Sequence, residues 1–247
     1  MTDPEHDANR DRSSRRDAED DDTDRFEVDE AFRTIGRTFE EYAAMFDLEP
    51  GAPSDRRVLD CPSGVGSFVG TARERGVPVV GADPLYGRPR DDIATTARED
   101  CEATVEQLRE TRDLFAWDWY GDIDGRADHL RRAHRRFLAD YPAGPYVAAG
   151  LPDLPFPDDS FDLALSANLL FLYDDRLDAA FHTAALRELA RVADEVRVFP
   201  LASLDTERSA FVEPSVTALR ADGLAVETRE VPYEFQRGVT EMLVVRR

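Results

Sequence analysis

The stretch that most constrains the fold is VLDCPSGVGSF at residues 58–68, an apolar run that ends in an acid and opens into a loop with two glycines. A buried strand that turns through such a loop into a helix begins a nucleotide-binding α/β unit. Gly64 and Gly66 let the backbone approach a ligand closely. Asp83 ends the next apolar run, about 20 residues after Asp60, where a carboxylate can accept hydrogen bonds from ribose hydroxyls. The bland alternative is a tight turn with Asp83 as its cap.

Strand and helix patterns alternate along the rest of the chain. The last two apolar runs have no helix between them, which is typical of an antiparallel pair. The sequence therefore predicts an α/β fold: a doubly wound, Rossmann-like, seven-stranded sheet that ends in an antiparallel hairpin. The expected strands lie at residues 56–61, 77–83, 145–150, 160–167, 195–201, 224–231 and 240–247. The expected helices lie at residues 65–76, 93–108, 177–192 and 214–223.

The N-terminal region divides into two parts. Residues 1–25 carry no large apolar side chain after Met1 and are expected to form a disordered acidic tail. Residues 26–50 are expected to form an N-terminal helix capped by Asp29, because apolar residues recur at helical spacing. These apolar residues are Phe32, Ile35, Phe39, Tyr42 and Phe46. Residues 51–247 then make up the main domain.

The charge is strongly negative, with 31 basic residues, all of them arginine, against 52 acidic ones and a net charge of −21. This charge repels phosphate backbones, so nucleic acid is an unlikely partner. An acid-rich, lysine-free composition resembles that of proteins from salt-loving archaea, which predicts adaptation to solvent rather than a basic partner. Cys61 and Cys101 are too few for a disulfide framework and are not spaced with histidines as metal ligands, so no metal site is expected. With no apolar run of membrane length, the sequence predicts a cytoplasmic protein with no membrane partner.

Between the second and third expected strands the chain is longer than one crossover helix requires. The extra piece, residues 114–141, contains both tryptophans and a helix that is apolar on one face. The other face carries Arg131, Arg132, Arg135 and Arg136. One interpretation is a helical lid over the acceptor pocket, whose arginines meet an anionic substrate. The other is that the arginines pair with surface acids and that Trp117 and Trp119 belong to the core.

Three features together resemble class I S-adenosylmethionine-dependent methyltransferases, of the methyltransferase type 11-like kind. They are the acid and loop at residues 60–66, the stretch LPDLPFPDDSFDLALSANLLFLY at residues 151–173, and the closing hairpin. The resemblance covers about residues 55–247. It implies that S-adenosyl-L-methionine is the cofactor and that the reaction is methyl transfer. It also implies contacts to the cofactor from Asp60, Cys61, Pro62, Gly64, Gly66, Asp83, Pro84, Leu151, Asp153 and Asn168.

The sequence departs from that family in two places. Pro62 replaces the first glycine of the loop, which removes one backbone donor. Gly150 stands where the family often has an acid near the adenine, and Asp153 is the nearby residue that can substitute for it. Neither departure removes the ribose acid Asp83 or the glycines at positions 64 and 66.

The candidates for chemistry follow the fourth expected strand. Asn168 can orient an acceptor, and Tyr173 or His182 can act as a base, although the last two can equally pack against or cap the next helix. A connection near the end of the chain, with Gln236, can reach the pocket or form a plain turn. The stretch after the strand lacks the signature of many amino-group methyltransferases, which favours a small-molecule acceptor. The alternatives are a non-catalytic, cofactor-binding or regulatory protein with this fold and, more remotely, a nicotinamide-dependent oxidoreductase. The oligomeric state is left open.

Overall fold

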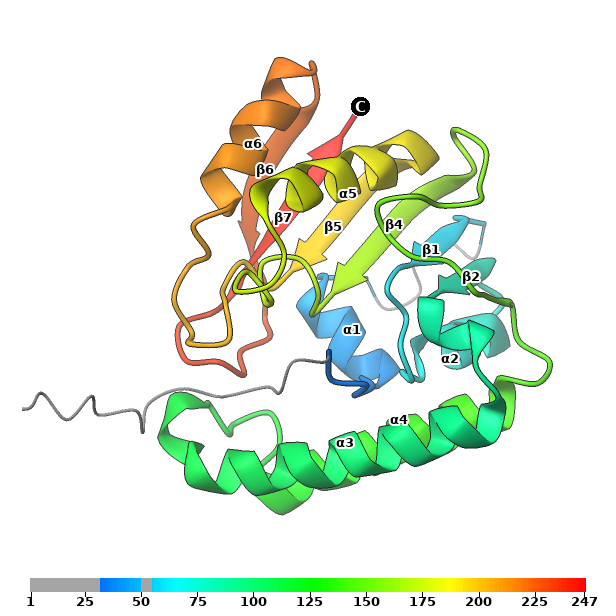
Figure 1. Ribbon diagram of the computed structural model, residues 1–247, viewed down its shortest axis with the longest axis vertical. Coiled ribbons are helices and arrows are strands. Elements are labelled where there is room, and N and C mark those ends of the chain that lie inside the picture. The colour runs from blue at the N-terminus through cyan, green and yellow to red at the C-terminus, as the bar shows by residue number, and fades with distance from the viewer. Residues whose placement is uncertain (1–31, 50–54) are drawn as a thin grey trace, which may run out of the picture.

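The computed structural model describes residues 32–49 and 55–247 of the chain, so the expected acidic tail and the expected cap Asp29 lie outside the described residues. The described residues form a seven-stranded sheet in the order β3-β2-β1-β4-β5-β7-β6 (Figure 1). β7 runs antiparallel to β5 and β6, and the other neighbouring strands are parallel. The predicted doubly wound sheet with a closing antiparallel hairpin is therefore confirmed. The strands are β1 (Val58–Asp60), β2 (Val79–Ala82), β3 (Tyr146–Val147), β4 (Phe161–Ala167), β5 (Ala193–Phe199), β6 (Ala225–Glu230) and β7 (Glu241–Arg246).

Helices cover both faces of the sheet. α5 and α6 lie over one face, and α1 and α2 lie against the other (Figure 1). Between β2 and β3, α3 and α4 pack side by side as a pair along one edge of the molecule. The helices are α1 (Phe39–Met45), α2 (Phe68–Glu74), α3 (Arg90–Glu110), α4 (Ile123–Asp140), α5 (Ala179–Val192) and α6 (Val212–Ala221), with short 3-10 turns η1 (Pro84–Gly87) and η2 (Arg112–Leu114). The helical insertion after the second strand is thus present.

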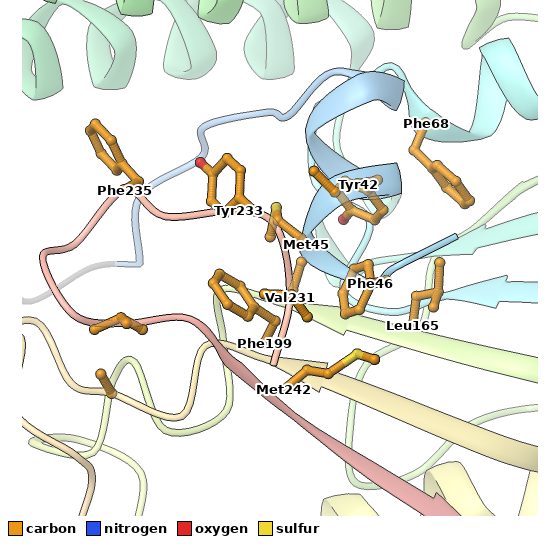
Figure 2. Close-up of a cluster of buried hydrophobic side chains, with 14 of the residues drawn as sticks. Tyr42, Met45, Phe46, Phe68, Leu165, Phe199, Val231, Tyr233, Phe235 and Met242 are labelled. Atoms are coloured by element: carbon orange, nitrogen blue, oxygen red, sulfur yellow. The ribbon is translucent and has the colours of Figure 1, made fainter. Parts of the chain in front are cut away.

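The core forms two layers because successive strand residues point to opposite faces. On β4, Leu163 and Leu165 join the cluster beneath α1 and α2, whereas Ala164 joins the cluster beneath α5 and α6. Figure 2 shows the cluster beneath α1 and α2, which brings together Tyr42 of α1, Phe46 at its C-terminal end, Phe199 of β5 and Met242 of β7. This burial fixes the sheet against α1 and so fixes the carboxyl ends of the strands where ligands bind in such folds.

The first described helix is shorter than expected. α1 begins at Phe39, with Thr38 as its N-cap, instead of near Asp29. The Thr38 hydroxyl accepts a hydrogen bond from the Glu41 amide, and the Glu41 carboxylate accepts one from the Thr38 amide, which is a capping box. Residues 32–38, called the N-terminal segment below, are irregular. Five of them line the cleft described below, although the helical pattern had assigned them to a helix. The helical spacing of apolar residues gave no sign that this segment lines a cleft.

Among residues 32–49 and 55–247, no helix combines the length and the apolar character that crossing a membrane requires.

Candidate functional site

A cleft of about 540 Å³ opens at the carboxyl ends of β1, β2 and β4. The register of the parallel strands explains its position, since Asp60 pairs with Gly81 on β2 and with Leu165 on β4. The loops that follow these strands therefore meet at one edge of the sheet. The volume lies in the range of small-molecule and cofactor pockets. We call it the main cleft.

The main cleft gathers most of the predicted cofactor residues. It is lined by Cys61, Pro62, Gly64, Asp83, Pro84, Leu151 and Asn168. Three of the predicted residues do not line it, namely Asp60, Gly66 and Asp153. Most of the predicted residues that line the cleft follow β1 and β2, whereas Asp60 and Gly66 are buried behind its surface.

Asp83 and Gly64 hold the loop and the second strand together. The Gly64 amide donates to one oxygen of the Asp83 carboxylate at 2.9 Å, and the Leu85 amide donates to the other at 2.9 Å. A carboxylate has about four acceptor positions, so two remain for other donors. Burial raises the pKa of Asp83, and the two amide bonds partly offset that rise. Asp83 is thus a preorganised acceptor on the wall of the cleft.

Gly64 requires a backbone conformation that favours glycine. Its φ is +54°, and a β-carbon at this position would meet no atom within 4 Å. The loop is therefore open to the cleft at Gly64, and its carbonyl accepts a hydrogen bond of 2.6 Å from the Tyr86 hydroxyl. The preceding Pro62 lines the cleft and does not close it.

Asp60 lies beneath the loop as a buried acid. Only 1% of its surface is exposed, and its Oδ1 accepts a hydrogen bond of 3.0 Å from the Tyr42 hydroxyl. Its Oδ2 is buried without a hydrogen-bond partner among the described residues. Burial, together with the negative charge of Asp83, raises the pKa of Asp60 to about 7, although the nearby hydroxyls of Ser63 and Tyr42 oppose the rise. An unsatisfied carboxylate oxygen next to a cleft favours a cationic or hydrogen-bonding ligand there.

The structure gives a packing reason for glycine at position 66, whereas the motif implies contact with a ligand. A β-carbon there would lie 3.2 Å from the carbonyl oxygen of Arg37, so Gly66 provides room for the N-terminal segment. Gly36 reciprocates, because a β-carbon on it would overlap the backbone of Val65 in the loop. The Ser67 amide donates to the Arg37 carbonyl at 2.9 Å, which ties the segment to the start of α2.

The N-terminal segment also lines the main cleft, which the sequence interpretation missed. Its residues Arg33, Thr34, Ile35 and Arg37 face the cleft beside Phe32. The Arg33 amide donates to the Tyr173 hydroxyl at 3.3 Å, and the Thr34 amide donates to Asp100 of α3 at 2.6 Å. The available sequence signal was the pattern Thr38-x-x-Glu41, which places the helix start after the segment.

Substitution of Gly36 by alanine is expected to lower affinity for a ligand of the main cleft about tenfold or more. The added β-carbon overlaps the loop backbone, so the N-terminal segment must move away from a cleft that it helps to form. Isothermal titration calorimetry measures the change. Gly87→Ala is the matched control, because a β-carbon there meets only Ala148 at an ordinary 3.8 Å. Equal affinities for the two variants would contradict the role of the segment.

The region after β3 explains one departure from the family pattern. A β-carbon on Gly150 would overlap the ring of Pro84, so no side chain, acidic or otherwise, fits at position 150. Asp153 is exposed and does not line the cleft. Leu85 and Leu151, the neighbours of Pro84 and Gly150 in the chain, line the cleft with apolar side chains, and Arg88 lines it as well. A planar, apolar ligand face suits these side chains better than a charged contact does.

The three candidates for chemistry occupy different positions. Asn168 and Tyr173 line the main cleft, and the Asn168 amide oxygen lies 3.5 Å from Nη2 of Arg37. Burial raises the pKa of Tyr173, so its hydroxyl stays protonated near neutral pH. His182 is fully buried and does not line the cleft. Its Nε2 accepts from the Phe171 amide at 3.2 Å, its Nδ1 lies 2.7 Å from the Asp178 carbonyl, and burial lowers its pKa.

The first part of the insertion packs against the connection between β6 and β7, and its helix α4 packs against α3. Phe115 stacks on Phe235, and Trp119 meets Tyr233 edge to face. Neither Trp117 nor Trp119 lines the main cleft, and both pack against the core. Two of the four arginines on α4 pair with acids: Arg131 with Asp128, and Arg136 with Glu74. Arg132 and Arg135 are exposed. None of the four arginines lines the main cleft.

The geometry of the main cleft is compatible with S-adenosylmethionine as a ligand. The Asp83 carboxylate has acceptor positions that are not occupied by the Gly64 and Leu85 amides. No atom fills the space beside the α-carbon of Gly64, and the buried Oδ2 of Asp60 has no hydrogen-bond partner among the described residues. Leu85 and Leu151 supply apolar walls. Within residues 32–49 and 55–247, no cluster of three or more histidine, cysteine or acidic side chains is arranged to hold a metal ion.

The comparisons with known proteins are distant. No family model matches the chain. The chain is 29% identical over 216 residues to the uncharacterized protein MJ0045 of Methanocaldococcus jannaschii, an alignment that covers 86% of this chain and 95% of that protein. Among solved structures, it is similar to a TehB-like S-adenosylmethionine-dependent methyltransferase from Corynebacterium glutamicum, with 18% identity, a TM-score of 0.45, and coverage of 84% of this chain and 85% of that one. It is also similar to the 1,6-didemethyltoxoflavin-N1-methyltransferase of Burkholderia thailandensis, a structure with bound S-adenosylhomocysteine, with 16% identity, a TM-score of 0.44, and coverage of 85% and 77%.

Proposed function

We propose that the protein transfers a methyl group from S-adenosylmethionine to a small-molecule acceptor. The observation that supports this most directly is the pairing of Gly64 with Asp83 across the mouth of the main cleft. It places an open backbone loop and a carboxylate with free acceptor positions at the carboxyl ends of β1 and β2. That is where a doubly wound sheet binds nucleotides. The resemblance of residues 60–66 and 151–173 to class I methyltransferases favours S-adenosylmethionine over other nucleotides as the ligand.

The cofactor would be held by three groups of residues. Asp83 would accept hydrogen bonds from the ribose hydroxyls, and Leu85 with Leu151 would enclose the adenine between apolar side chains. Asp60 would supply negative charge behind the loop toward the positively charged end of the cofactor. A cation that binds near Asp60 favours its ionised form and so offsets the cost of burying that charge.

When bound, the cofactor supplies an electrophilic methyl group, whose transfer forms a bond to the acceptor atom, breaks the carbon–sulfur bond and leaves the electron pair on sulfur. This chain's residues mainly align the acceptor and exclude water. Asn168 can orient the acceptor from the end of β4, and the protonated Tyr173 can donate a hydrogen bond but is not poised to remove a proton. An acceptor whose nucleophilic atom is already unprotonated suits this site best.

The small acceptor follows from the enclosure of the cleft. The N-terminal segment crosses the loop and leaves a volume of about 540 Å³, which is enough for the cofactor and a small partner. The net charge of −21 opposes a polyanionic partner. These two observations favour a small molecule over nucleic acid.

The test is calorimetric titration of the wild-type protein with S-adenosylmethionine in molar salt. Asp83→Ala is expected to raise the dissociation constant about 5- to 150-fold, because it leaves ribose hydroxyls and the Gly64 amide without an acceptor, at about 1–3 kcal/mol. Asp153→Ala removes a nearby exposed carboxylate outside the cleft and is expected to bind like the wild type. Absence of binding to folded wild-type protein would overturn the proposal. Preferential binding of NADH would support an oxidoreductase instead.

A non-catalytic, cofactor-binding role is distinguished by turnover. Incubation of the pure protein and a cell extract with the methyl-labelled cofactor is expected to label a small molecule in the wild-type sample and not in the Asp83→Ala sample. Cofactor binding without any labelled product would favour the regulatory alternative.

A further inference from the structure

A second, smaller chamber lies directly against the main cleft. Its volume is about 60 Å³, and it shares Arg37, Asn168 and Tyr173, among other residues, with the main cleft. The remaining walls come from distant parts of the chain. They include Leu108 of α3, Phe115 and Arg126 of the insertion, and Phe235 and Gln236 of the connection between β6 and β7. We call this space the inner chamber.

Two buried arginines face the inner chamber. Arg37 of the N-terminal segment is 8% exposed, and Arg126 of α4 is 1% exposed. Their guanidinium carbons lie 5.9 Å and 5.3 Å from the centroid of the same aromatic ring, that of Phe235, so the two charges are close to each other. Arginine remains protonated in proteins, so both positive charges persist at any relevant pH.

One carboxylate serves both guanidinium groups. Oε1 of Glu41 lies 3.6 Å from Nη1 of Arg37 and 3.2 Å from Nη1 of Arg126. The same oxygen also accepts a hydrogen bond of 2.6 Å from the Tyr120 hydroxyl. In the part of the chain that the structure describes, Glu41 is the only acid that pairs with either arginine. Two guanidinium groups and one carboxylate therefore leave an excess of one positive charge in a buried position.

Several nitrogens of the two arginines have no hydrogen-bond partner among the described residues. These are Nε and Nη1 of Arg37 and Nε of Arg126. Beyond its pair with Glu41, Nη2 of Arg37 lies 3.5 Å from the Asn168 amide oxygen, and its charge also interacts with the hydroxyls of Tyr120 and Tyr233. Buried, charged donors without a hydrogen-bond partner are unfavourable, and the planar fork of a guanidinium matches the two oxygens of a carboxylate. An anion in the chamber satisfies the nitrogens and neutralises the excess charge.

We propose that the inner chamber binds the carboxylate of the methyl acceptor, and this rests on the proposed function. A volume of about 60 Å³ accommodates a carboxylate but not a nucleotide or a second cofactor. The walls around the arginines are mostly apolar, with Leu108, Phe115 and Phe235 among them. The acceptor is thus a small organic acid whose carboxylate lies between Arg37 and Arg126 while the rest of it extends past Asn168 toward the main cleft.

The test uses fluorinated probes in ¹⁹F NMR titrations of the protein saturated with S-adenosylhomocysteine. Trifluoroacetate and 4-fluorobenzoate carry the carboxylate, and trifluoroacetamide and 4-fluorobenzamide are neutral controls of similar shape. At least one acid is expected to bind about tenfold or more tightly than its amide. Acids that bind no better than their amides to the wild-type protein would overturn the proposal, and this comparison requires no variant.

A matched pair of substitutions on α4 tests whether the acid binds in the inner chamber. Arg126→Met keeps Glu41 paired with Arg37 and is expected to weaken binding of the acid about tenfold or more. Arg135→Met removes an exposed arginine of the same helix and is expected to leave binding unchanged. Unchanged binding in a folded Arg126→Met protein, as judged by circular dichroism, would also overturn the proposal.

Failure of this proposal and failure of the proposed function give different results. Calorimetry with S-adenosylhomocysteine on the same samples reports the main cleft separately, because Arg126 does not line it. If the wild-type protein does not bind S-adenosylhomocysteine, the methyltransferase function is overturned. If it binds S-adenosylhomocysteine but shows no preference for the acids, only the carboxylate site is overturned.

Discussion

Replacing Glu41 by glutamine should lower the free energy of unfolding by about 3–5 kcal/mol, because the substitution leaves two buried arginines without a counter-charge. Glu41 is fully buried and is the ion-pair partner of both Arg37 and Arg126. Burial alone would raise its pKa, but contacts from His129, Arg37 and Tyr120 hold that pKa below its usual value. The same substitution removes a charged acceptor of the Thr38 amide in the capping box. Denaturant unfolding measures the change from the shift in midpoint at constant slope.

The neighbouring residue Glu40 supplies the control. Its side chain is 61% exposed and lies 3.7 Å from Arg75 at the surface. Glu40→Gln is expected to change the free energy of unfolding by no more than about 0.5 kcal/mol. If Glu41→Gln were as mild as Glu40→Gln, the two arginines would not depend on Glu41, and the excess charge assigned to the inner chamber would have another counter-ion.

The second large effect concerns Asp60 and pH. Its pKa is raised from 3.8 to about 7 in the folded protein, first by burial and then by the charge of Asp83. Between these two pH values the folded state holds the proton that the unfolded state has lost. Stability without cofactor should therefore fall as pH rises from about 4 to about 7 and then level off, by about 4 kcal/mol from this residue. Asp83 contributes with the same sign, because burial raises its pKa as well.

Asp60→Asn removes the part of this decline that belongs to Asp60. Its stability should exceed that of the wild type at pH 8, and the difference between the two proteins should shrink as pH falls toward 4. Asp153→Asn is the same substitution at an exposed position and should follow the wild-type curve. Denaturant midpoints collected at intervals from pH 4 to pH 8 provide the comparison. Parallel curves for Asp60→Asn and the wild type would show that Asp60 ionises normally.

Asp60→Asn should also weaken binding of S-adenosylmethionine at pH 8, since the ionised carboxylate favours a cation. A variant that is more stable than the wild type but binds the cofactor more weakly is expected when the buried acid serves binding rather than folding. If Asp60→Asn is more stable than the wild type and binds S-adenosylmethionine equally tightly, Asp60 does not contribute to cofactor binding.

The fold could be predicted largely from the sequence because its signals are local. Apolar runs of strand length, an acid at the end of β1, and two final strands without a helix between them are all visible within short windows. The parallel register then brings Asp60 and Asp83 to one edge whatever the details of packing. The extent of α1 was also readable, since Thr38 and Glu41 have the spacing of a capping box, but the apolar periodicity upstream led to a longer expected helix.

The site beyond the loop depends on contacts between residues that are far apart in the chain. Gly66 reads as a ligand contact in the sequence, yet the structure shows it making room for Arg37. His182 has the chemistry of a base but is held by backbone groups in the core. No local pattern brings residue 37, residue 126 and residue 235 to one chamber, because their proximity follows from the packing of the N-terminal segment, α4 and the β6–β7 connection.

The sequence by itself determined the sheet, the glycine loop and the acid that meets it, because strand periodicity and chain direction are properties of neighbouring residues. Only the tertiary structure decided which side chains close the cleft and where positive charge is left unbalanced. Burial and charge pairing depend on segments distant in sequence. Of the four arginines in the row on α4, two pair with acids and two are exposed, whereas Arg126 on the same helix is buried.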